Sequence, residues 1–175
     1  APDGPRGPER CFERILVGPP LLDTQQDFDN AARAVLAHLP GERKPGEPVV
    51  LMGHGTRHEG DSCYERLARI IRAHDPSIHI ATMGGKLTID TVLPALAVPD
   101  APPVWLMPFL AVAGAHVVKD MAGDHPESWK SILTRAGVPC RTVLKGAAEY
   151  DAFADIWISH LRRVMSRLAE GVPRG

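Results

Sequence analysis

Two histidines in this chain stand where a metal ion could be held. His54 follows the apolar run 49–52 between two glycines, and His116 follows the apolar segment 104–115. Neutral imidazoles are good ligands for Co²⁺, Ni²⁺ and Fe²⁺. Because ligands of open α/β sheets bind beyond the carboxyl ends of the strands, two histidines delivered there would leave coordination positions open for a substrate.

Each histidine also has a simpler interpretation. The segment 53–56 has the composition of a tight strand-to-helix turn, in which His54 would be incidental. His58 would either support a ligand histidine or simply be solvated. Asp124, in the polar stretch after His116, would either orient that histidine or cap the next helix. The residues alone leave these alternatives open.

The elements that would position the histidines alternate along the chain. Short apolar runs predict strands over residues 15–17, 49–52, 78–82, 104–107 and 141–144. Helical spacing of apolar residues predicts helices over residues 27–39, 62–74, 88–97, 128–136 and 150–168. This alternation indicates a three-layer, doubly wound α/β fold with a mostly parallel sheet, of the flavodoxin-like kind.

A length of 175 residues fits one domain. Its proline- and glycine-rich start, residues 1–14, predicts a flexible lead, and residues 15–48 predict a connecting segment with one helix. Residues 49–175 would form the α/β domain that carries the metal site. The closing helix is expected to place its apolar face in the core, namely Phe153, Ile156, Trp157, Leu161, Val164, Met165 and Leu168.

Composition argues against several classes of function. A formal net charge of −1 disfavours a nucleic-acid-binding surface, and no apolar run approaches the roughly 20 residues of a membrane helix. Cys11, Cys63 and Cys140 are too widely spaced for a structural zinc site and predict free thiols. No motif for an organic cofactor is evident. The chain starts at Ala1, so a signal peptide could have been removed; the cytoplasm is expected, with the periplasm as the alternative.

The two histidine segments together resemble the anaerobic sirohydrochlorin cobaltochelatases, a family of class II tetrapyrrole chelatases. Met52–His58 matches the family's Met-Gly-His-Gly-Thr-x-His, and Val112–Asp124 matches its Val-Ala-Gly-x-His-x-x-x-Asp-Met-Ala-Gly-Asp. Val17–Leu22 and Ser128–Lys130 fit the same pattern. The resemblance extends from about Ile15 to the closing helix. It implies a chelatase-like fold that corresponds to the second half of the family's usual two-domain chain.

The resemblance implies that His54 and His116 are the metal ligands and the catalytic residues. The expected reaction is insertion of Co²⁺, with Fe²⁺ or Ni²⁺ as other candidates, into a sirohydrochlorin-like tetrapyrrole for cobalamin or sirohaem biosynthesis. The family also has a glutamate, which is replaced here by Gly84. Loss of that carboxylate should weaken metal binding and remove a proton acceptor, unless Asp90, Asp120 or Glu59 compensates.

Further residues are expected around the substrate. The carboxylate arms of sirohydrochlorin could be met by Arg57, Lys86 and Lys119 through charge-assisted hydrogen bonds, although each would otherwise be a solvated surface charge. Phe109, in an apolar loop, could cover the face of the macrocycle. Beyond the ligands, the side chains expected to support the metal site are His58, Asp120 and Asp124.

Two other interpretations compete with a chelatase. The replacement by Gly84 favours a non-catalytic half-chelatase that binds a metal or a tetrapyrrole. An unrelated flavodoxin-like binding module with structural histidines is the second. If the chain is a chelatase, we expect it to act as a homo-oligomer or to pair with a separate N-terminal half.

Overall fold

A computed structural model describes residues 15–170, with side chains to residue 168. The predicted flexible lead at 1–14, which includes Cys11, lies outside the described residues. Four parallel strands form one sheet in the order β2-β1-β3-β4. The strands are β1 (Val49–Gly53), β2 (Ile78–Thr82), β3 (Val104–Pro108) and β4 (Cys140–Thr142). The helices are α1 (Gln25–Ala37), α2 (Ser62–His74), α3 (Ile89–Leu96), α4 (Trp129–Arg135) and α5 (Asp151–Glu170).

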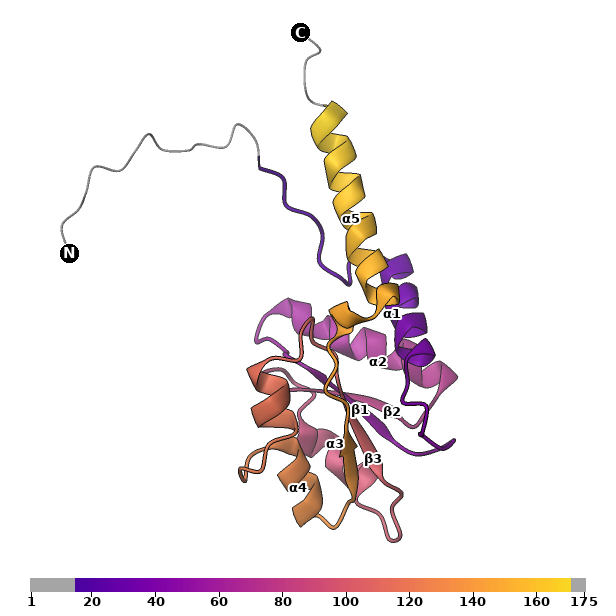
Figure 1. Ribbon diagram of the computed structural model, residues 1–175, viewed down its shortest axis with the longest axis vertical. Coiled ribbons are helices and arrows are strands. Elements are labelled where there is room, and N and C mark those ends of the chain that lie inside the picture. The colour runs from indigo at the N-terminus through magenta and orange to yellow at the C-terminus, as the bar shows by residue number, and fades with distance from the viewer. Residues whose placement is uncertain (1–14, 171–175) are drawn as a thin grey trace, which may run out of the picture.

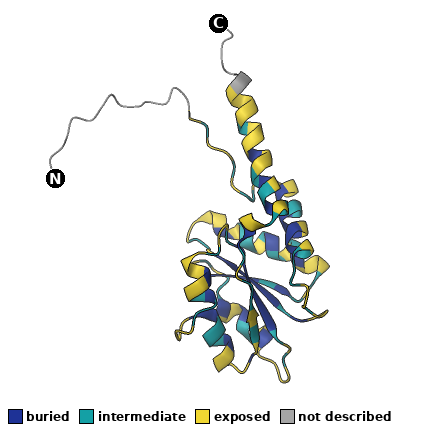
Figure 2. Cartoon of the chain, in the orientation of Figure 1, coloured by how far each residue is buried: buried dark blue, intermediate teal, exposed yellow. Residues whose placement is uncertain are grey.

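The sheet is the middle of three layers (Figure 1). Val49 and Leu51 of β1 belong to a core formed with α1, α2 and α5, whereas Val50 and Met52 belong to a core formed with α3 and α4. All five residues of β1 are buried, as expected for a central parallel strand covered on both faces (Figure 2). The predicted three-layer α/β fold with a parallel sheet is confirmed.

Local signals explain most of the helix boundaries. Thr24 and Asp27 form a reciprocal capping box at the start of α1. The Ser128 side chain accepts a hydrogen bond from the Ser131 backbone at the start of α4, and Gly137, with φ 75°, follows the end of that helix. Helix α2 and strand β2 have the predicted bounds. The helix predicted over residues 88–97 begins at Ile89, and the side chain of Thr88 before it makes no capping hydrogen bond.

Two predictions about the core are wrong. Residues 15–17 form no strand, and Ile15 and Val17 are largely exposed. In α5, Phe153 and Ile156 are buried, but Leu161, Met165 and Leu168 are exposed, because the C-terminal part of this helix extends beyond the rest of the domain (Figure 1). Helical spacing identifies the apolar face of a helix but does not show whether a neighbour covers it.

The two cysteines within the described range, Cys63 and Cys140, are free. Burial raises the pKa of the Cys140 thiol, which makes it a poor nucleophile. Among residues 15–170, no helix combines the length and the apolarity needed to cross a bilayer.

Candidate metal centre

The two histidines lie side by side at the carboxyl edge of the sheet. His54 directly follows β1, and His116 begins a short π-helix, η2 (His116–Met121), that follows the neighbouring strand β3. Their ring centroids are 5.5 Å apart and the ring planes meet at 83°. Two adjacent parallel strands thus bring together imidazoles that are far apart in the sequence.

Hydrogen bonds fix which nitrogen of each ring is free. Nδ1 of His54 donates to the Gly55 carbonyl oxygen at 3.0 Å, and Nδ1 of His116 donates to Oδ2 of Asp120 at 2.6 Å. Because a carbonyl and a carboxylate oxygen only accept, both rings keep Nε2 as the nitrogen with a free lone pair. This tautomer is the one that a metal-binding histidine needs.

The π-helix sets the position of His116. Buried Val117 and Met121 anchor η2 in the core between the sheet and α4, while His116 and Asp120 face outward one turn apart. The Ala122 N–H bonds to the Val117 carbonyl, the i to i−5 pattern of a π-turn. Such turns are rare and occur frequently at functional sites.

A cavity of about 490 Å³ opens beside the two imidazoles. Its other acidic or basic side chains are Asp90, Asp120, His125 and Glu127, and its lining also includes Trp129 and Ile132. Within residues 15–168, no third histidine, cysteine, aspartate or glutamate lies close enough to the pair to complete a group of three. The arrangement therefore offers two nitrogen ligands and leaves the remaining coordination positions open.

A second cavity of about 420 Å³ adjoins the first. It is lined by Thr56, Arg57, His58, Asp61, Met83, Gly84, Gly85 and Lys86. Met83 and Gly84 line both cavities. The structure therefore groups Arg57, His58 and Lys86 with one another in a neighbouring cavity, not against the histidine pair.

Gly84 lies in the loop after β2, where its backbone N–H donates to the His54 carbonyl oxygen at 2.9 Å. A Cβ atom at this position would lie 3.6 Å from the same oxygen, an ordinary contact. The backbone at position 84 therefore has room for a Cβ atom.

Three of the predicted site residues have other surroundings. Phe109 is 9% exposed and packs edge to face against Tyr64 and Phe153, so the prediction that it covers a substrate is wrong: the end of β3 directs it into the core. Lys119 is exposed on η2 and lines neither of these two cavities. Asp124 pairs with Lys130 at 2.7 Å, which lowers the pKa of Asp124.

Glu127 and His125 line the cavity beside the histidine pair, although neither was among the site residues expected from the sequence. They lie in the loop that leads into α4, next to η2. In the sequence, only their short distance from His116 along the chain could have indicated them. Asp120 connects His125 to His116, because its second carboxylate oxygen, Oδ1, is 3.8 Å from Nε2 of His125.

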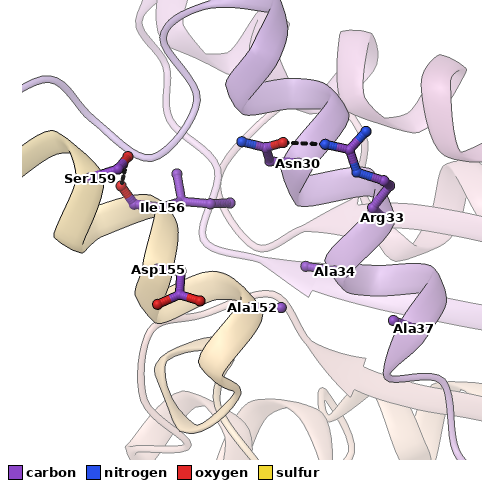
Figure 3. A pocket seen from close by; sticks show the side chains of 8 residues that line it. All are labelled: Asn30, Arg33, Ala34, Ala37, Ala152, Asp155, Ile156 and Ser159. Carbon is purple, nitrogen blue, oxygen red and sulfur yellow. Dashed lines mark hydrogen bonds between the residues drawn. The ribbon is translucent and has the colours of Figure 1, made fainter.

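A third cavity, between α1 and α5, lies away from this centre (Figure 3). It measures about 340 Å³, and its floor is formed by Ala34, Ala37, Ala152 and Ile156. Its lining contains no histidine or cysteine, and Arg33 donates a hydrogen bond to Asn30. It offers no site for a transition metal.

The family described as cobalt chelatase (CbiK) matches residues 8–166 of this sequence. The chain belongs to the cobalt chelatase (CbiK) family. This cobalt chelatase family member is 52% identical over 157 residues to "Sirohydrochlorin cobaltochelatase CbiKC" of Nitratidesulfovibrio vulgaris, an alignment that covers 90% of the chain and 56% of the relative. It is 30% identical over 159 residues to "Sirohydrochlorin cobaltochelatase" of Salmonella typhimurium, covering 91% of the chain and 60% of the relative.

Solved structures agree with the chelatase fold. "SirB from Bacillus subtilis with Fe3+" superposes with a TM-score of 0.60 at 14% identity, over 88% of this chain and 59% of that one. DR2241 from Deinococcus radiodurans, described as a multi-domain protein with structural similarity to chelatases, superposes with a TM-score of 0.52 at 17% identity, over 75% of this chain and 28% of that one. At such identities the similarity concerns the fold alone. The chain spans somewhat more than half the length of the curated relatives it matches.

Proposed function

We propose that this chain is the metal-binding part of a sirohydrochlorin cobaltochelatase, which inserts Co²⁺ into sirohydrochlorin. The observation that carries the proposal is the His54–His116 pair, with centroids 5.5 Å apart and both Nδ1 atoms occupied by hydrogen bonds. The names of the two curated relatives support the substrate and the metal. Fe²⁺ and Ni²⁺ remain alternative metals, since imidazole ligands suit all three ions.

The proposed reaction exchanges two pyrrole N–H protons for one divalent metal ion. Nε2 of His54 and Nε2 of His116 hold Co²⁺ while water fills the other positions. The tetrapyrrole nitrogens displace the water and then the imidazoles, so a site with only two protein ligands favours transfer over retention. Each displaced imidazole accepts one of the two pyrrole protons at its Nε2, and the Asp120 carboxylate, 2.6 Å from Nδ1, stabilises the resulting imidazolium at His116.

The carboxylates of Asp90 and Glu127 give the same cavity further acidic groups. Both are exposed and line the space beside the histidine pair. Within the described residues, neither side chain takes part in a hydrogen bond or an ion pair. We propose that they attract the hydrated cation and relay pyrrole protons to solvent through water, in part replacing the family glutamate for which Gly84 stands here.

The partner is proposed to be a second α/β half, either another copy of this chain or a separate N-terminal half. His116 is about half exposed, so a macrocycle bound there would be covered on one side only. The exposed apolar residues of α5 offer a surface on which such a half could pack.

Gly84 favours one alternative, a half-chelatase that binds a metal or a tetrapyrrole without turnover. An insertion assay distinguishes the two functions, because Co²⁺ insertion changes the visible absorbance of sirohydrochlorin. We expect the chain to raise the insertion rate above the uncatalysed rate, and His54→Ala and His116→Ala to abolish the increase. No turnover with intact Co²⁺ binding, together with activity in Gly84→Glu, would support the alternative.

A further inference from the structure

A buried carboxylate near the histidine pair, that of Asp61, has no part in the reaction described above. Asp61 is 4% exposed and directly precedes α2, where an aspartate side chain usually caps the helix. Its side chain makes no capping hydrogen bond to α2. Instead its two oxygens accept the backbone N–H groups of Thr56 at 3.1 Å and of Lys86 at 2.8 Å. The buried charge therefore serves the loops after β1 and β2 and not its own helix.

The hydrogen bond from Thr56 acts on the peptide unit that also contains the Gly55 carbonyl. That carbonyl oxygen accepts the Nδ1 proton of His54 at 3.0 Å. A trans peptide unit is planar, and its N–H and C=O groups point in opposite directions. Because Asp61 holds the Thr56 N–H, the Gly55 oxygen is directed toward the imidazole of His54.

Gly55 by itself gives this peptide unit little preference for one orientation. Its φ is 73°, and glycine populates positive and negative φ about equally. A larger residue has no room, since a Cβ atom at this position would lie 2.5 Å from the backbone nitrogen of Gly85. The loop thus needs glycine here, and the orientation of the next peptide unit has to be fixed by a hydrogen bond.

The peptide unit on the other side of Gly55 is held by different contacts. The His54 carbonyl oxygen accepts the Gly84 N–H at 2.9 Å, and the Gly55 N–H donates to the Tyr64 hydroxyl at 3.4 Å. Neither contact acts on the Gly55–Thr56 peptide unit. Within residues 15–168, the Thr56 N–H is bonded to Asp61 alone, so this carboxylate decides whether His54 Nδ1 has its acceptor.

We propose that Asp61 is a positioning residue for His54 and acts through the Gly55–Thr56 peptide unit. The inference rests on the proposed function, in which His54 is a metal ligand, and deepens it. Asp61 keeps the proton on Nδ1 of His54 and leaves the Nε2 lone pair for the metal. Asp120 does the same for His116 by direct contact. Each imidazole is thus oriented by one carboxylate, in one case directly and in the other through a peptide unit.

The direct test is the tautomer of His54, measured by ¹⁵N NMR on the metal-free chain at about pH 9, well above the usual pKa of a histidine. We expect the wild type to carry the His54 proton on Nδ1, and Asp61→Ala to convert the ring to a mixture of tautomers. His116 is the internal control, because Asp120 still holds its Nδ1. A merely structural role of Asp61 would change both rings or neither.

The affinity for Co²⁺, measured by isothermal titration, should fall about 10- to 100-fold in Asp61→Ala. The matched control is Glu47→Ala. Glu47 is also buried, and its carboxylate accepts the Lys44 N–H at 3.1 Å and the Trp105 Nε1–H at 2.8 Å, but it precedes β1 and so lies at the opposite edge of the sheet. Its loss should weaken the fold and leave the His54 tautomer and the Co²⁺ affinity unchanged.

Gly85→Ala tests the same contact without removing the carboxylate. The three atoms nearest to a Cβ atom at Gly85 all belong to the Asp61 carboxylate, which a methyl group would have to displace. We expect Gly85→Ala to reproduce the tautomer change and the loss of Co²⁺ affinity. The double variant Asp61→Ala/Gly85→Ala should lose no more than Asp61→Ala, because the methyl group then has room and the two effects are not additive.

The inference and the proposed function fail separately. If the wild type binds Co²⁺, an unchanged His54 tautomer or an unchanged Co²⁺ affinity in Asp61→Ala and Gly85→Ala would overturn the inference, as would an equal loss in Glu47→Ala. A tautomer change in a chain whose wild type binds no Co²⁺ would contradict the proposed function and support the role of Asp61. Co²⁺ insertion at the wild-type rate by Asp61→Ala would do the reverse.

Discussion

At the scale of single residues, the proposed metal site depends on how Asp120 orients His116. The carboxylate accepts the Nδ1 proton at 2.6 Å and thereby directs the Nε2 lone pair outward. Asp120 and His116 are both substantially exposed, so the contribution of this contact is positional more than stabilising. Asp120 is therefore a positioning residue for the metal ligand.

We expect Asp120→Asn to lower Co²⁺ affinity and the insertion rate by about 10- to 100-fold, because an amide can present its N–H₂ to Nδ1 and favour the wrong tautomer. Isothermal titration with Co²⁺ measures the affinity. Asp124→Asn is the matched control, since Asp124 pairs with Lys130 and makes no hydrogen bond to either histidine. A similar loss in both variants would contradict a specific role for Asp120.

The sequence predicted the meeting of His54 and His116 because both follow buried strands, and such strand ends share one edge of a parallel sheet. It could not predict the side on which each neighbouring residue lies. Phe109 directly follows β3 and turns inward, whereas Asp90 and Glu127 reach the site from other elements. Side-chain direction at a strand end depends on tertiary packing, which a single sequence does not reveal.

At the scale of elements, a buried side-chain hydrogen bond joins α1 to α5. Nε2 of His160 lies 2.9 Å from Oδ1 of Asp27, and both side chains are nearly inaccessible to solvent. Burial by itself would raise the pKa of Asp27, but the Thr24 N–H, the Thr24 hydroxyl and His160 outweigh it and lower the pKa from 3.8 to about 2. Asp27 thus serves both the capping box of α1 and the contact with α5.

The lowered pKa gives this contact a defined pH dependence. The stabilisation is complete above the ordinary pKa of 3.8 and is lost as the pH falls toward about 2. Asp27→Asn should therefore reduce the free energy of unfolding at pH 7 by about 2 kcal/mol, and its difference from the wild type should shrink between pH 4 and pH 2. Urea unfolding across this range measures it, with exposed Asp23→Asn as the control; a constant difference would contradict the linkage.

Element boundaries followed the sequence where capping chemistry is local. Helix α2 has the predicted bounds, and α4 begins at its Ser128 cap. Residues 15–17 had the composition of a strand, but Ile15 and Val17 are exposed and find no partner strand. A strand needs a neighbour with free hydrogen-bonding groups, and only the fold determines whether one is present.

At the scale of the whole molecule, α5 leaves an apolar surface uncovered. Ile158, Leu161, Met165 and Leu168 recur at intervals of three and four residues and are each between 38% and 59% exposed. In Figure 1 this part of α5 stands clear of the sheet and its covering helices. Apolar residues at such spacing form one stripe, which is typical of a helix that packs against another surface.

We expect this stripe to mediate association with a second α/β half. Leu161→Asp should abolish concentration-dependent self-association in sedimentation velocity while leaving the unfolding midpoint nearly unchanged. Phe153→Ala, in the buried part of the same helix, should instead destabilise the fold by about 3–5 kcal/mol. A wild-type chain that stays monomeric at all concentrations would contradict the homo-oligomer and leave a separate half as the partner.

The most direct test of the central claim is anomalous diffraction from crystals of this chain soaked in Co²⁺. We predict one strong cobalt peak about 2 Å from Nε2 of both His54 and His116, with water in the remaining positions. His116→Ala should remove the peak. Cobalt bound elsewhere, with no density between the two imidazoles, would contradict the account.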